Sequence, residues 1–257
     1  MRGTLLLLWL LAAPPAGAQA PPAVRTLVEH MSRGVRATKV GDWVTYELDG
    51  GGRRVHYWRL AAVGEEKDRL GRDALWIEID LGTHPAMAAP LGQLKMLVAR
   101  ETGLSAQGIT RLIVASGFDR PQEYSPEALE VALGREPTAA RRGRAAGPGP
   151  GIRSGPETQL MTLAGTVPAV PLEVRYRSTV IKRLWMSREI PVLQLAKIEI
   201  PGIGQSMEVR DFGVNAKPLM AMPEPDAPKV RLEYLDEAFS QLPQPGGAAS
   251  AGEGGPP

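Results

Sequence analysis

Apolar and polar residues alternate with a period of two along much of the chain between residues 41 and 213. Such alternation predicts β-strands that bury one face and leave the other in water. The clearest run is 170–177, where Val, Leu, Val and Tyr alternate with Pro, Glu, Arg and Arg. Further strands are predicted at 43–48, 53–63, 75–81, 93–99, 109–115, 181–187, 193–200 and 206–212.

The strands follow one another through short turns, which favours an antiparallel meander because parallel pairing would need crossover helices. We expect about ten strands and two or three helices. A large sheet with one apolar face and little helix to cover it must curl on itself or leave an apolar concavity. The predicted fold class is therefore mainly β (α+β), a strongly curled antiparallel sheet or incomplete β-barrel.

Two segments have the spacing of amphipathic helices. Residues 24–31 carry Val, Leu, Val and Met at i, i+3, i+4 and i+7, and Gly34 is expected to end this helix. Ser125 can cap a second helix that starts with Pro126 and ends at Gly134. Residues 230–242 fit either a helix or a strand.

The N-terminal residues have the three zones of a secretory signal, namely an early Arg, an apolar run and small residues. We expect residues 1–18 to be removed, which places the mature protein in the periplasm or outside the cell. The apolar run is shorter than the ~20 residues that span a bilayer. One domain is predicted at 24–213, interrupted by a flexible Arg/Gly/Pro-rich insert at 137–156, then a C-terminal extension (214–242) and a disordered tail (243–257).

Charge narrows the range of partners. The chain has a net charge of +2, but residues 135–156 alone hold five Arg and one acid. A flexible insert does not hold these charges on one face, so nucleic acid is not an expected partner. The insert is either a solvated linker or a peripheral contact for anionic lipid headgroups.

The sequence offers no recognisable catalytic centre. It has no Cys, and its three His residues lack the ligand spacing of a metal site. Neither a Gly-x-Ser-x-Gly elbow nor a Ser-x-x-Lys pair occurs. We therefore predict no catalytic residue, metal or cofactor, and a protein that is not an enzyme.

Methionines are spread through the predicted sheet, and this residue type suits surfaces that accept variable apolar ligands. Ordinary core packing is the alternative explanation. If one sheet face lines a cavity, apolar members of the alternating strands would bind the ligand. The candidate ligand-binding residues are Val44, Tyr46, Ile77, Met96, Leu172 and Tyr176.

Several segments together resemble exported bacterial proteins of the lipoprotein-carrier (LolA/LolB-like) superfamily and related uncharacterised periplasmic families. They are Gly41–Tyr46, Leu163–Ala169 with its Ala-Gly-Thr, Leu184–Pro191 with its Trp-x-Ser, Lys197–Glu199 and Met207–Gly213. The resemblance implies an unclosed β-barrel whose apolar concave face holds acyl chains. It makes the helix from Ser125 to Leu133 the lid candidate, while the lid-latching arginine of the carriers has no clear counterpart here.

These observations favour an exported, non-catalytic protein that binds an apolar ligand or a lipidated partner in a half-barrel cavity. The alternative is a cell-envelope scaffold or assembly factor that acts through protein contacts. An envelope hydrolase is the weakest of the three readings, since no nucleophile and base pair is recognisable.

Overall fold

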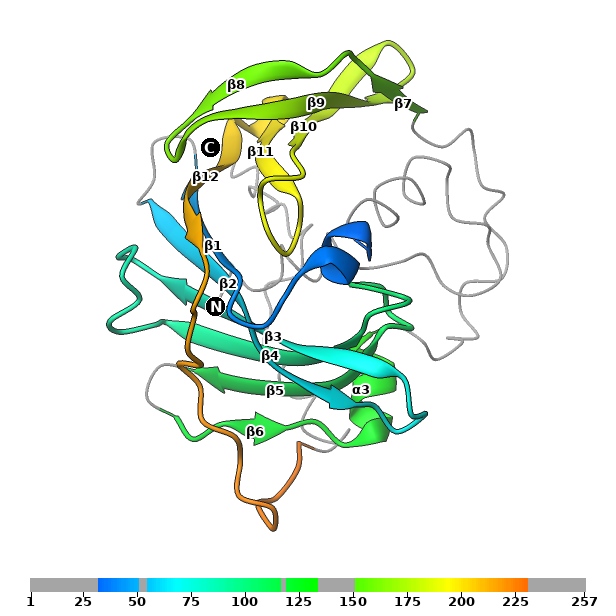
Figure 1. Cartoon of the computed structure of the whole chain (residues 1–257), viewed down its shortest axis with the longest axis vertical. Coiled ribbons are helices and arrows are strands. Elements are labelled where there is room, and N and C mark those ends of the chain that lie inside the picture. Colours follow the sequence, from blue (N-terminus) through cyan, green and yellow to red (C-terminus); the bar gives the residue numbers. More distant parts are fainter. Residues whose placement is uncertain (1–31, 51–54, 117–118, 134–150, 231–257) are drawn as a thin grey trace, which may run out of the picture.

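The computed structural model describes residues 32–50, 55–116, 119–133 and 151–230 (Figure 1). In this part of the chain, twelve strands form one sheet in the order β6-β5-β4-β3-β2-β1-β12-β11-β10-β9-β7, with β8 paired to β9. All neighbouring strands are antiparallel. The predicted fold class is confirmed.

The described elements divide into two halves. The first-half strands are β1 (Trp43–Asp49), β2 (His56–Lys67), β3 (Asp73–Gly82), β4 (Gly92–Ala99), β5 (Ile109–Ser116) and β6 (Gln122–Glu123). The second-half strands are β7 (Gly151–Ser154), β8 (Thr158–Thr162), β9 (Gly165–Tyr176), β10 (Thr179–Met186), β11 (Leu195–Ile200) and β12 (Gln205–Gly213). The helical segments are 32–37, α3 (Pro126–Ala132) and the short 3-10 turn η2 (Pro201–Ile203).

Pairing of β1 with β12 joins the two halves into one surface. Register shifts interrupt several pairs, including β1 with β12 and β2 with β3. Such bulges bend strands and increase their twist. The sheet therefore curls around helix 32–37 and the β10–β11 loop, with β3 to β6 on one side and β8 to β11 on the other (Figure 1).

The concave face carries the main core. Val44, Leu60 and Ile77 of the first half and Leu172 and Leu184 of the second are at most 3% exposed and belong to one cluster. Burying a side chain of this size contributes roughly 1.5–3 kcal/mol to stability. The alternation read from the sequence thus corresponds to a single inward-facing apolar surface.

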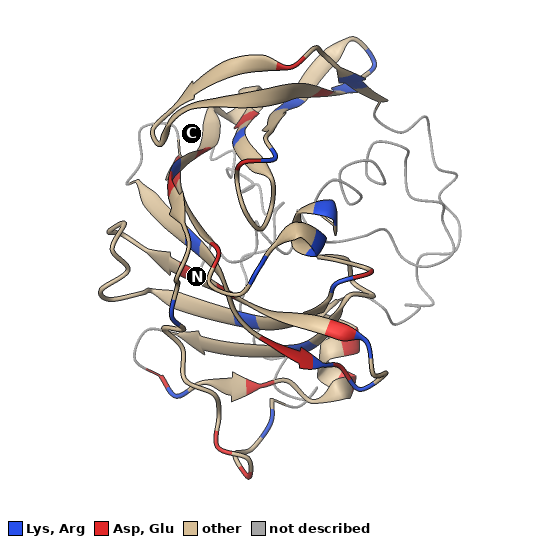
Figure 2. Ribbon diagram, viewed as in Figure 1, with Lys and Arg blue, Asp and Glu red and all other residues tan. Residues whose placement is uncertain are grey.

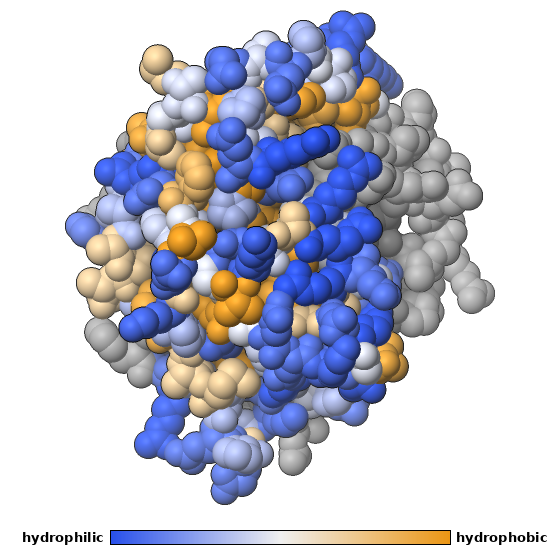
Figure 3. All heavy atoms as spheres, in the orientation of Figure 1, coloured by the Kyte–Doolittle hydropathy of each residue, from blue (hydrophilic) through white to orange (hydrophobic). Residues whose placement is uncertain are grey.

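The convex face is charged along the second half of the sheet. Lys197 forms ion pairs of 3.2 Å with both Glu199 and Glu208, while Arg183 lies 3.8 Å from Glu199. Charged positions accordingly recur along these strands in Figure 2. On the face shown in Figure 3, apolar side chains form separate patches among hydrophilic ones.

Residues 214–222, which we call the outer strap, follow β12 and cross the convex face of the first half. Trp43 Nε1 donates to Val214 O at 3.3 Å, and Leu219 N donates to Glu78 Oε1 at 2.6 Å. Met220 is 3% exposed and packs in a second small cluster with Trp76. The strap therefore buries charged outward-facing residues that would otherwise meet water.

The predicted helix from Ser125 is confirmed as α3, with Ser125 Oγ accepting a hydrogen bond from Ala128 N at 3.2 Å. The predicted end of the first helix at Gly34 is wrong, because residues 32–37 are helical throughout. Gly34 instead allows a close approach of Val192, which is described below. Residues 24–31, where that helix was expected to begin, lie outside the described residues.

The prediction that the insert stays flexible as far as residue 156 is wrong at its C-terminal end. β7 pairs with β9 from Gly151 to Ser154, and Ile152 packs partly against the main core. The twelve residues of β9 are enough to pair with β8 along one part of the strand and with β7 along another.

Residues 1–18, 137–150, 231–242 and 243–257 lie outside the described residues. Within the described part, no helix is both long and apolar enough to cross a membrane.

Candidate functional site

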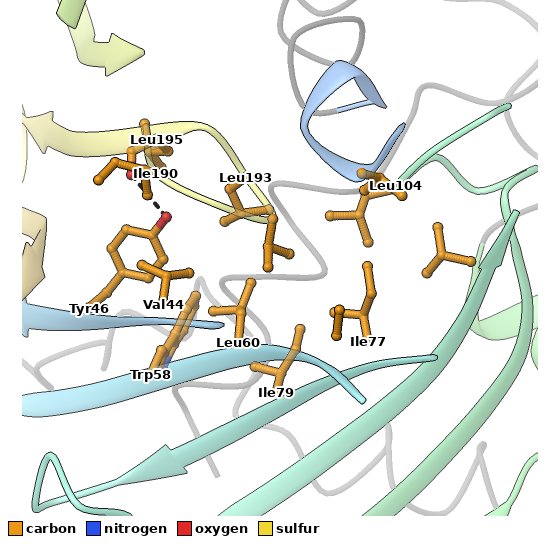
Figure 4. Close-up of a cluster of buried hydrophobic side chains, with 14 of the residues drawn as sticks. Val44, Tyr46, Trp58, Leu60, Ile77, Ile79, Leu104, Ile190, Leu193 and Leu195 are labelled. Atoms are coloured by element: carbon orange, nitrogen blue, oxygen red, sulfur yellow. Dashed lines mark hydrogen bonds between the residues drawn. The ribbon is translucent and has the colours of Figure 1, made fainter. Parts of the chain in front are cut away.

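Five of the six predicted ligand-binding residues lie together on the concave face. Val44, Tyr46 and Ile77 have no exposed surface, while Met96 is 2% and Leu172 3% exposed. All five belong to the main cluster of buried side chains, part of which is shown in Figure 4. Tyr176 is apart from them, at the end of β9, where it is 46% exposed.

The β10–β11 loop, residues 187–194, fills the space that faces these residues. We call it the plug loop. Its side chains Ile190 and Val192 are completely buried, and Leu193 is 4% exposed. Ile190 and Leu193 point toward the side chains of β1 and β2 (Figure 4). The plug loop thus fills the concave side with apolar side chains.

A tyrosine at the centre of the concave face is tied to the strand that follows the plug loop. Tyr46 Oη donates a hydrogen bond of 2.9 Å to Leu195 O (Figure 4). Burial raises the pKa of Tyr46 well above its ordinary value, so the hydroxyl stays neutral. This residue therefore offers the interior one satisfied polar group rather than an acid or base.

The plug loop packs against residues 32–38, that is, helix 32–37 and Thr38, which we call the seat. Thr38 Oγ1 donates to Gly34 O at 2.8 Å and accepts from Val192 N at 3.1 Å. A Cβ atom on Gly34 would lie 2.5 Å from Val192 O, a separation that real Cβ contacts do not show. Glycine at 34 is thus required by the close approach of helix and loop.

The plug loop has a strained backbone. Val192 has φ of 66° and Gln194 has φ of 52°. Left-handed conformations are costly for non-glycine residues, most of all for a β-branched one such as valine. Strain of this kind costs on the order of 1–3 kcal/mol per residue and persists only where surrounding contacts hold it. The buried side chains of Ile190 and Val192 and the hydrogen bond of Val192 N to Thr38 Oγ1 hold the loop in this conformation.

The seat is fixed to the first half of the sheet. Ser32 Oγ donates to Thr102 O at 3.1 Å, and Arg100 Nη1 donates to Thr38 O at 2.9 Å. Helix α3, the lid candidate from the family resemblance, contributes the buried Leu129 to the same core. The β4–β5 loop adds the buried Leu104 to this core as well, and among these covering segments the plug loop is the one with non-glycine residues at positive φ.

Sequence reasoning missed the plug loop and its seat. The segment 188–192 combines Arg, Glu, Ile, Pro and Val, which has neither a strand nor a helix period. One signal was available in the sequence. Ile190 and Val192 are large apolar residues outside any predicted strand or helix, and such residues are usually buried, as both are here.

A depression of about 660 Å³ lies on the convex face, within the size range of ligand pockets. Two arginines line it. Arg59 donates a hydrogen bond to the carboxylate of Asp80, and Arg210 donates one to the carboxylate of Glu47. Because these arginines are engaged, the depression offers an anion little free charge. Its lining residues are Trp43, Thr45, Arg59, Pro85, Ala86, Leu163, Arg210 and Asp211.

Among the residues that the structure describes, no three His, Cys, Asp or Glu side chains are grouped so that they could hold a metal ion. The buried carboxylates of the convex face are paired. Burial, followed by the neighbouring charge of Glu78, raises the pKa of Asp80 above its ordinary value, while Arg59 and Gln93 hold its oxygens. These acids hold the sheet and the outer strap together.

No family model matches the sequence, and no curated protein matches it. A solved structure of MucB is 10% identical, with a TM-score of 0.40 over 82% of this chain and 66% of MucB. The MucA/MucB complex from Pseudomonas aeruginosa gives 11% identity and a TM-score of 0.36 over 75% of this chain and 57% of that one. The chain spans at most two thirds of these MucB chains.

An exported protein with a YmcC-like fold from Bacteroides fragilis is 7% identical. Its TM-score is 0.32, and the alignment covers 68% of this chain and 97% of that protein.

Proposed function

We propose that this chain is an exported, non-catalytic protein that binds an apolar ligand, or the lipid part of a lipidated partner, on the concave face of its sheet. The observation that carries the proposal is the plug loop. Within the described residues, it covers part of the main apolar cluster with a turn in which Val192 and Gln194 have positive φ. Export rests on the signal in residues 1–18, which lies outside the described residues.

In this proposal the plug loop and the ligand exclude each other. The loop places Ile190, Val192 and Leu193 against the sheet when no ligand is bound. A ligand displaces them and replaces their apolar contacts, while relief of the backbone strain offsets part of the cost. Only molecules in which the plug loop has moved away can bind the ligand. The apparent affinity is therefore lower than the affinity of this open form, in proportion to the fraction of molecules that are open.

A neutral apolar probe tests the location of the site. N-phenyl-1-naphthylamine should bind the wild-type protein and be displaced by hexadecan-1-ol. Met96→Gln keeps a similar side-chain length but places an amide in the apolar interior, so it should weaken probe binding severalfold. The measurement is a fluorescence titration of both variants, with circular dichroism to confirm that each is folded.

The matched control is Leu163→Gln, which changes a side chain that is 53% exposed and lines the convex depression. This variant should bind the probe as the wild type does. If Leu163→Gln binds the probe more weakly than Met96→Gln does, the probe site lies on the convex face and the proposal is wrong. A wild-type protein that binds no apolar probe would contradict the proposal.

The alternative of an envelope scaffold has one observation in its favour. Met161 is 80% exposed and Leu163 53% exposed, both at the β8–β9 hairpin. Exposed apolar side chains beside an open strand edge are typical of protein contact sites. Absence of probe binding in the titration above would favour this alternative.

A further inference from the structure

One lysine of β10 faces the concave side. Leu184 of β10 pairs with Leu172 of the neighbouring strand β9, and both belong to the buried core. Side chains two residues apart on a strand point to the same face. Lys182 therefore lies on the concave face next to Leu184, and its partner across the strand is Val174.

The surroundings of Lys182 are apolar. Val174 pairs with Ile152 of β7, so Ile152, Val174 and Lys182 form one row across three strands. Both apolar residues of this row are partly buried and pack against the main core. The strand then runs inward from Lys182 through Leu184 to Met186, which is 7% exposed.

Lys182 lacks a partner that other enclosed cations have. Lys95 lies 3.2 Å from Glu78, and Arg59 lies 2.9 Å from Asp80. Within the described residues, Lys182 is partly buried, and its ammonium group has neither a hydrogen bond nor an ion pair. Burial lowers the pKa of Lys182 below its ordinary value. An ammonium group that loses water without gaining an anion is costly, so such groups are normally paired.

We propose that Lys182 binds the acidic headgroup of an amphipathic ligand whose hydrocarbon chain lies along the concave face, a deepening that rests on the function proposed above. The apolar row beyond the ammonium group favours a ligand with a chain over a free inorganic anion. Leu184 and Leu172 contact the part of the chain nearest the headgroup. Neutral apolar molecules bind the same face without this ion pair.

A pair of ligands with equal chains tests the assignment. Hexadecanoic acid and hexadecan-1-ol are titrated against the full chain preloaded with N-phenyl-1-naphthylamine. The wild type should bind the acid more tightly than the alcohol. Lys182→Met should weaken binding of the acid about tenfold, which is about 1.4 kcal/mol, and leave binding of the alcohol unchanged. Lys182→Arg should retain the preference for the acid.

The control variant is Arg183→Met, which removes the same charge from the next residue, on the opposite face of β10. Arg183 pairs with Glu173 and Glu199 on the convex side. Equal loss of acid binding in the Lys182 and Arg183 variants would overturn the assignment, because it would reflect net charge alone. Equal affinity of the wild type for acid and alcohol would overturn it too. If the wild type binds neither ligand, the proposed function itself fails.

Discussion

Gly34→Ala is expected to destabilise the protein by about 1–3 kcal/mol, the usual cost of forcing an extra group into a packed interior. The same exchange in an ordinary helix stabilises by roughly 0.5–1 kcal/mol. The sign reverses here because the new Cβ would lie 2.5 Å from Val192 O, and this contact is to backbone. Urea unfolding followed by circular dichroism measures the difference.

Gly34→Ala should also loosen the plug loop and thereby strengthen binding of the neutral apolar probe. The matched control is Gly202→Ala in η2, where no atom lies within 4 Å of the added Cβ. That variant should remain within about 0.5 kcal/mol of the wild type, as surface exchanges usually do. A Gly34→Ala protein as stable as the wild type would mean that helix and loop do not meet as described.

Lys95→Met is expected to have the largest effect on stability, a loss of about 3–5 kcal/mol, because it removes the nearest cation from a buried carboxylate and leaves only Arg59, at 3.9 Å. Lys95 Nζ lies 3.2 Å from Glu78 Oε2 and donates to Met220 O at 2.7 Å. The side chain of Glu78 is completely buried. The variant therefore loses an ion pair and one attachment of the outer strap.

Lys67→Met is the comparison for Lys95→Met. The ion pair of Lys67 with Asp73 has side chains that are 66% and 73% exposed, so its loss should cost at most about 1 kcal/mol. The double variant Lys95→Met with Glu78→Gln should regain part of the stability, since the buried charge is removed while a side-chain oxygen can still accept from Leu219 N. If Lys95→Met unfolds at the same urea concentration as Lys67→Met, the outer strap does not bury the pair.

The strands were predictable because their signal is local. A strand that buries one face alternates apolar and polar residues, and the sequence of β9 from Val170 to Tyr176 shows this without knowledge of its neighbours. The helix α3 was predictable for a similar reason, since Ser125 and Pro126 specify its start. A curled sheet followed from too little helix to cover one apolar face.

What the sequence did not reveal depends on contacts between distant segments. β7 exists because β9 is long enough to pair with it, and nothing in its Gly-Ile-Arg-Ser specifies a strand. Glu78 and Lys95 look like solvated outward positions until the outer strap covers them. Gly34 reads as a helix end, whereas its role is set by Val192, far along the chain.

Five of the six candidate site residues lie on one face of the sheet because strand alternation decides the face. Tyr176 was misplaced relative to the others, since it belongs to the same strand pattern but lies at its exposed end. The plug loop could not be predicted, because its position depends on the seat formed by residues 32–38.

Hydrogen exchange of the plug loop tests the central claim most directly. The amide of Val192, bonded to Thr38 Oγ1, is protected in the closed state. Saturating hexadecan-1-ol should accelerate exchange at residues 187–194 and leave the amides that link β1 to β2 protected. Binding of the alcohol with unchanged exchange at 187–194 would contradict the claim that plug loop and ligand compete for the concave face.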